Sequence, residues 1–134
     1  MKLAFIIALL FALGSCLHST DSGQNPEDLP LAYKQPVYVS ALNLTLTLDN
    51  VADGRCPKDA LCIVASHAEI QILAKQGIAN QTIFLGIGGF RYSKSEILFD
   101  KYRVEFLSLE PDVDASRYLK NYKAHVNISA LPSS

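Results

Sequence analysis

Leu42-Asn43-Leu44-Thr45-Leu46-Thr47-Leu48-Asp49 is the stretch of sequence that decides the fold class of this chain. A leucine alternates with a polar residue at every step. Successive side chains of a β-strand point to opposite faces of a sheet. The alternation therefore predicts a strand whose leucines enter a core while its asparagine, threonine and aspartate side chains face water.

The same two-residue period continues toward the C-terminus. It recurs in residues 68–72, 102–109 and 122–128. Within the second of these ranges the alternation shifts by one residue between Phe106 and Leu107, so that the apolar residues change from even to odd positions. Such a shift occurs at a β-bulge or strand bend. Each range predicts a further strand with one buried face and one wet face.

Two more strands are indicated by apolar content. Residues 82–87 are apolar on both faces, which predicts a central strand, and the glycines in 86–89 indicate a bend where that strand ends. Ile97 and Phe99 mark a short strand, and residues 112–121 have room for one short helical turn at most. The pattern predicts an all-β domain over 36–130, a small antiparallel β-sandwich or barrel of about six to seven strands.

The N-terminus has the features of a secretory leader. Lys2 supplies a positive charge, and residues 3–13 are apolar but too few for a transmembrane helix, which needs about 20 residues. We therefore expect residues 1–15 to be a signal peptide. Residues 16–35 are polar and contain Pro, Gly and Ser, which predicts a flexible tether, and residues 131–134 form a C-terminal tail.

The leader ends in Leu13-Gly14-Ser15-Cys16, which resembles the lipobox of bacterial lipoproteins. The resemblance implies that Cys16 becomes the mature N-terminus and carries acyl chains such as palmitate as a membrane anchor. Leu17 stands where inner-membrane lipoproteins of some bacteria carry Asp, which favours the outer membrane. The alternative is an ordinary signal peptide cut after Gly14 or Ser15, which would release a soluble protein.

The other two of the three cysteines, Cys56 and Cys62, predict a disulfide. Disulfides persist in the oxidising compartments that a leader implies. A zinc site is disfavoured because no third or fourth ligand stands at the usual spacing, and the C-x-x-C spacing of redox proteins is absent. The bridge would close a short loop between two predicted strands.

This loop lies in a segment that resembles part of some small bacterial lipoproteins of unknown function, with a D-x-R-C-P-x4-C pattern between two strands. The matching residues are Asp53, Arg55, Cys56, Pro57, Cys62 and Ala68. Val64 and Ser66 stand where that family usually has Trp and Gly. The resemblance implies an all-β extracytoplasmic fold and supplies no reaction.

The residues of this loop also predict its local structure. Asp53-Gly54 is a turn dipeptide, and Arg55 is expected to pair with Asp53 or Asp49. A purely structural loop, closed by the disulfide, is favoured over a loop that binds a partner. The candidate residues of a binding loop would be Arg55, Lys58 and His67.

No catalytic or metal-binding constellation is evident in the sequence, and no cofactor is expected. There is no G-x-S-x-G nucleophile elbow, and the acidic groups match no calcium loop. The net charge of −1, without a basic stripe, disfavours nucleic acid as a partner.

We therefore expect a lipid-anchored, non-catalytic β-domain protein of the bacterial cell envelope. It would act as a binding or structural module, with the membrane and an envelope protein or glycan as partners. The alternatives are an inhibitor of a secreted hydrolase, acting through the 56–62 loop, and a soluble carrier of a small ligand. The carrier would require an open barrel with a cavity.

Overall fold

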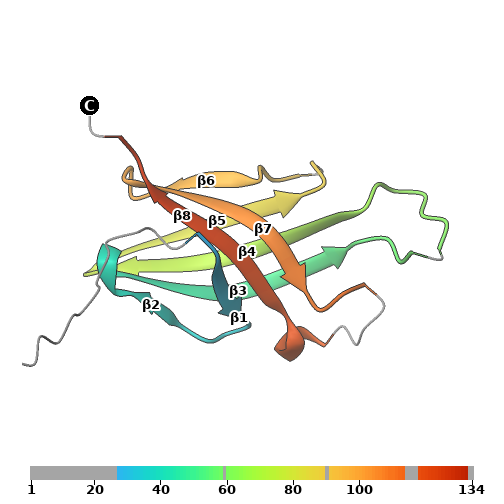
Figure 1. The fold of residues 1–134 in the computed structure, drawn as a ribbon, viewed down its shortest axis with the longest axis horizontal. Coiled ribbons are helices and arrows are strands. Elements are labelled where there is room, and N and C mark those ends of the chain that lie inside the picture. Colours follow the sequence, from blue (N-terminus) through green and yellow to red (C-terminus); the bar gives the residue numbers. More distant parts are fainter. Residues whose placement is uncertain (1–26, 59, 90, 114–117, 133–134) are drawn as a thin grey trace, which may run out of the picture.

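The computed structural model describes residues 27–58, 60–89, 91–113 and 118–132. The predicted signal peptide, the lipidation site Cys16 and the first part of the predicted tether lie outside these residues. Eight strands and two short 3₁₀ turns make up the described chain (Figure 1). They are β1 Leu29–Ala32, β2 Val37–Val39, η1 Ser40–Leu42, β3 Leu44–Gly54, β4 His67–Gln76, β5 Ala79–Ile87, β6 Ser95–Leu98, β7 Tyr102–Glu110, η2 Leu119–Asn121 and β8 Lys123–Ala130.

The strands form two antiparallel sheets of four strands each. One has the order β1-β8-β7-β6 and the other the order β2-β3-β4-β5. The chain passes from one sheet to the other between β1 and β2, and returns between β5 and β6 (Figure 1). The predicted all-β class is confirmed, and of the two predicted architectures the protein adopts the sandwich.

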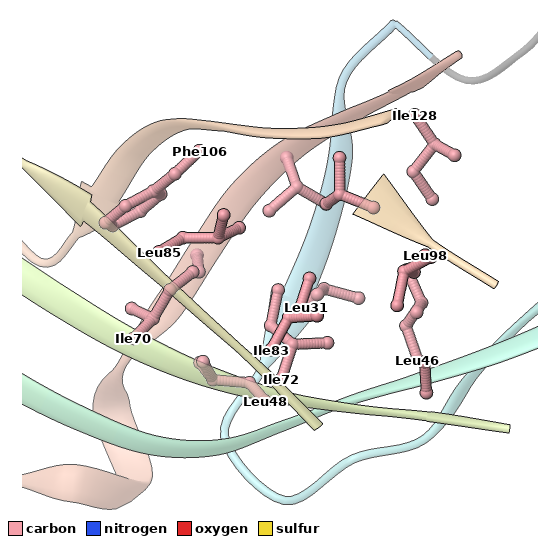
Figure 2. Close-up of a cluster of buried hydrophobic side chains, with 14 of the residues drawn as sticks. Leu31, Leu46, Leu48, Ile70, Ile72, Ile83, Leu85, Leu98, Phe106 and Ile128 are labelled. Carbon is pink, nitrogen blue, oxygen red and sulfur yellow. The ribbon is translucent and has the colours of Figure 1, made fainter. Parts of the chain in front are cut away.

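The alternation of the leucine-rich stretch fills the space between the sheets. Leu44, Leu46 and Leu48 of β3 are fully buried and belong to the same hydrophobic cluster as Phe106 and Ile128 of the other sheet. Figure 2 shows Leu46 and Leu48 within this cluster. Burial of one such side chain stabilises the fold by about 1.5–3 kcal/mol. The core is therefore a continuous apolar layer between the two sheets.

A β-bulge changes the phase of β3 midway. Its register against β4 shifts between Leu48 and Asn50, so that Val51 is the next buried residue. Beyond the bulge the odd-numbered residues face inward, and Asp53 is thereby directed toward the end of the core. A bulge was also expected in residues 102–109, and β7 does shift register between Phe106 and Ser108.

Three boundary and placement predictions are corrected. The β domain begins at Leu29 rather than at 36, because β1 pairs with β8 within the predicted tether. Pro30 does not prevent this, since proline is tolerated on an edge strand. Residues 82–87 belong to β5, which is an edge strand and not a central one. In β6 the buried residue is Leu98, whereas Phe99 lies beyond the strand with φ of 50°.

Candidate functional site

The segment between β3 and β4 extends past the ends of both strands (Figure 1). The predicted disulfide is present in it: Cys56 is bonded to Cys62, with 6.0 Å between their Cα atoms. The backbone N–H of Cys56 also donates to Ser66 Oγ at 3.1 Å, which joins the two arms of the loop at its base. We call residues 55–66 the stapled loop.

Arg55 fastens the stapled loop to both sheets. Its Nε and Nη2 donate to the two carboxylate oxygens of Asp53, each at 2.9 Å, so the predicted ion pair with Asp53 is formed. Its Nη1 donates to the carbonyl of Leu109 at 2.9 Å and Nη2 to that of Pro111 at 2.6 Å. The planar guanidinium thus satisfies a carboxylate and two carbonyls at once, as a lysine ammonium could not.

The carboxylate of Asp53 is almost fully enclosed, with 4% of its side chain exposed. Burial alone raises its pKa, but hydrogen bonds from Arg55 and then from the hydroxyl of Tyr122, at 2.8 Å, outweigh that effect. The pKa of Asp53 consequently falls from 3.8 to about 2. Asp53 is therefore ionised at neutral pH.

The far part of the stapled loop presents apolar side chains to solvent. Leu61 and Ile63 are fully exposed, at 104% and 105% of their reference areas, and Val64 is 54% exposed. Lys58 is exposed in the same loop. We call Leu61, Ile63 and Val64 the apolar tip.

The residues proposed as a binding loop therefore have different positions. Lys58 is exposed. The side chain of Arg55 is only 18% exposed, and its guanidinium points into the sandwich. His67 is the first residue of β4, at the base of the loop, and its Nδ1 lies 3.0 Å from the carbonyl oxygen of Ala65. The structure brings Arg55 and the disulfide together as a rigid base, with Lys58 beyond it.

Sequence reasoning missed the apolar tip and the role of Tyr122. The signal for the tip was present, because Leu61, Ile63 and Val64 cluster around a cysteine without the alternation of a strand. The alternation of residues 122–128 predicts a core position for Tyr122, and it is indeed 4% exposed, but its hydroxyl also donates to Asp53 across the end of the sandwich. Only the packing of the two sheets, which brings the residue before β8 to the end of β3, creates that contact.

No known family model matches the chain, and neither a curated protein nor a solved structure does. Among the described residues, none of the helical segments is long or apolar enough to cross a bilayer.

Proposed function

We propose that this chain is a lipid-anchored, extracytoplasmic binding module of the bacterial cell envelope, without catalytic activity. The leader and the lipobox-like Leu13-Gly14-Ser15-Cys16 support secretion and anchoring, with the outer membrane favoured by Leu17. The observation that carries the binding role is the apolar tip, held in water on a base fixed by the disulfide and by Arg55.

The partner of the apolar tip is an envelope protein with an apolar recess. Single exposed apolar residues are common, but three exposed apolar residues within four positions of one loop favour an interaction site. Binding of a flexible loop loses free energy in ordering it, and a loop already constrained loses less. The cross-links at the base therefore favour affinity at the tip.

The course of β1 supports presentation of the stapled loop away from the anchor. β1 runs antiparallel to β8, with Leu29 opposite Val126 and Ala32 opposite Lys123. Lys123 follows Tyr122 at the end of the sandwich that carries the stapled loop. β1 therefore heads toward the end of the sandwich that carries the stapled loop, and this direction supports a loop that points away from an anchor at Cys16.

Site-specific photo-crosslinking in cells tests the binding role. A photoreactive amino acid in place of Ile63 is expected to give a discrete adduct with an envelope protein. The matched control is the same amino acid in place of Ile78, which is equally exposed at 103% but lies in the β4–β5 turn. Adduct formation at neither position, or equally at both, would contradict the proposal.

The intact mass of the membrane-extracted protein tests the anchor separately. We expect a chain that begins at Cys16, is heavier by its acyl groups, and loses both the acyl mass and membrane association in a Cys16→Ser variant. A native chain without acyl mass would contradict the lipid anchor.

Inhibition of a secreted hydrolase is the second candidate, favoured by the exposure of Lys58 within the disulfide-closed segment. A basic side chain on a rigid loop suits the specificity pocket of a trypsin-like protease. Slower hydrolysis by such proteases, lost in Lys58→Ala but not in Lys120→Ala, would support this function. The carrier alternative required an open barrel, and the apolar layer between the two sheets offers it no support (Figure 2).

A further inference from the structure

The outer face of the β3-β4-β5 sheet carries a row of side chains that could contact a ligand. Asn50 of β3 lies opposite Gln71 of β4, which in turn lies opposite Phe84 of β5. In the next row toward the stapled loop, Glu69 lies opposite Gly86. Outward side chains of neighbouring strands are within reach of one another, so these residues form one surface.

The segment after β5 folds back onto this surface. The backbone turns at Gly88 and Gly89, with φ of 95° and 68°, and the N–H of Gly86 donates to the carbonyl of Ser93 at 2.9 Å. A Cβ atom on Gly86 would lie 2.8 Å from the carbonyl oxygen of Tyr92, so glycine is needed for this approach. Tyr92 is thereby placed beside Phe84, and their rings stack with centroids 5.1 Å apart and 22° between planes.

Phe84 and Tyr92 form an aromatic ridge that lines two surface hollows. The first has a volume of about 150 Å³ and is also lined by Asn50, Glu69, Ile70, Gln71 and Arg91. The second has a volume of about 330 Å³ and is also lined by Gln81, Thr82, Ile83 and Glu96. Phe84 remains 40% exposed between them. The ridge therefore has polar side chains on either side.

Glu69 supplies the observation that points to a ligand. Its Oε1 is buried and has no hydrogen-bond partner among the described residues. A buried acceptor without a donor is unfavourable, and such groups are rare in folded proteins. A carboxylate oxygen accepts hydrogen bonds only, so the missing partner is an N–H or O–H group.

We propose that this surface binds the sugar residues of a glycan chain, one on each side of the aromatic ridge. Sugar rings have an apolar C–H face that packs on aromatic rings, and hydroxyl groups that donate to a carboxylate and exchange hydrogen bonds with amides. Glu69 accepts from a sugar hydroxyl in the first hollow, where Asn50 and Gln71 supply the amides. The two open hollows suit an extended chain. This site is separate from the stapled loop and goes beyond the function proposed above.

Titration of the full chain with cellotetraose, chitotetraose and mannotetraose, followed by calorimetry and by NMR of the tyrosine and phenylalanine rings, tests the proposal. At least one oligosaccharide is expected to bind and to shift the ring signals of Phe84 and Tyr92. Phe84→Ala and Glu69→Gln should each weaken binding by about tenfold, the effect of losing one good contact. Tyr38→Ala is the control, since Tyr38 is a 61% exposed aromatic on β2 of the same sheet.

Glu69→Gln gives a second readout that a purely structural role would not produce. It keeps the shape of the side chain and removes its charge, whose electrostatic partner Arg91 is exposed to solvent, so the midpoint of thermal unfolding should change little while sugar affinity falls. The proposal is overturned if none of the three oligosaccharides binds, or if binding survives both substitutions. Binding of tetramethylammonium without any of the sugars would likewise overturn it, by assigning the aromatic ridge and Glu69 to a cationic ligand.

Discussion

The guanidinium of Arg55 donates a 2.6 Å hydrogen bond to the carbonyl of Pro111, a residue 56 positions later in the chain and beyond the end of β7 in the other sheet. The same guanidinium holds the carboxylate of Asp53 in β3. One side chain therefore connects the two sheets at the base of the stapled loop. The contact is the structural reason for a basic residue directly before Cys56.

Replacement of Arg55 by lysine should destabilise the domain by about 1–3 kcal/mol, the cost of leaving an enclosed acceptor without its hydrogen bond. Lysine keeps the positive charge, but its single ammonium cannot make the paired contact with Asp53 and also reach both carbonyls. Chemical denaturation measures the loss. Lys58→Ala serves as the control, because Lys58 is exposed in the same loop. An Arg55→Lys variant as stable as the native chain would show that the network contributes nothing.

Acid should weaken the domain through Asp53. Its folded-state pKa of about 2 lies below its ordinary value of 3.8, so the carboxylate contributes stability above pH 3.8 that is lost as the pH falls through about 2. The linked free energy is about 2 kcal/mol. Asp53→Asn should lower stability at neutral pH and flatten its fall in acid, as measured by urea denaturation at a series of pH values. If Asp53→Asn loses stability in acid as steeply as the native chain, Asp53 is not the group responsible.

His125 should give a second pH dependence of the opposite sign. Its Nε2 lies 2.9 Å from Glu110 Oε2 and its Nδ1 lies 2.7 Å from Asp28 Oδ1. The hydrogen bond to Glu110 raises the pKa of His125 above its ordinary 6.5, and Asp28 raises it further. Partial burial of the ring acts in the opposite direction but is outweighed. Its contribution to stability is complete below pH 6.5 and is lost as the pH rises through the folded-state pKa.

Glu110 complements this behaviour, because its hydrogen bond with His125 lowers its pKa below the ordinary 4.5, with a smaller contribution from Lys123. Its contribution is present above pH 4.5 and is lost as the pH falls further. The cluster should therefore stabilise the domain most between these two pH values. In the His125→Gln variant, the loss of stability above pH 6.5 should disappear. If thermal scans of this variant still show that loss, another group is responsible for it.

Removal of the disulfide should destabilise the domain modestly. Cys56 and Cys62 are separated by 6 positions, and the chain-entropy model gives about 2 kcal/mol for a loop of this length. The double variant Cys56→Ser, Cys62→Ser should therefore still fold, with Arg55 holding the base. Hydrogen exchange of the loop amides should rise in this variant while that of β3 and β4 stays unchanged. Global unfolding would contradict this expectation.

Gly86→Ala should disturb the surface that carries the aromatic ridge. The added methyl would meet the carbonyl of Tyr92 at 2.8 Å, so the segment after β5 must move away. Overpacking of this kind destabilises by about 1–3 kcal/mol. We expect the ring-stacking shifts between Phe84 and Tyr92 to disappear from the NMR spectrum. Retention of those shifts would show that the segment adapts without leaving the sheet.

The contrast between β3 and β5 shows why the sequence predicts some placements and not others. The leucines of β3 alternate because one face of the strand is buried, and Leu44, Leu46 and Leu48 are buried as predicted. Leu42, the first leucine of the predicted strand, lies instead in η1 and is only partly buried. Residues 82–87 look central because Phe84 adds an apolar residue to the outer face. The structure shows that Phe84 is packed by Tyr92 from the following segment, not by another sheet layer. Periodicity reports which faces are apolar, but not what covers them.

Local physical chemistry, read from the sequence alone, determined the all-β class and most of the strands, and it predicted a bulge or bend in β7, a pairing of Arg55 with Asp53 or Asp49, and the short disulfide. Each of these depends on residues close together in the chain or on the two-residue period of a strand. Only the tertiary structure decided that the sheets form a sandwich, that Arg55 turns inward to Leu109 and Pro111, and that Glu69, Phe84 and Tyr92 share one surface. These contacts depend on the path of the chain between strands, which the pattern within each strand does not encode.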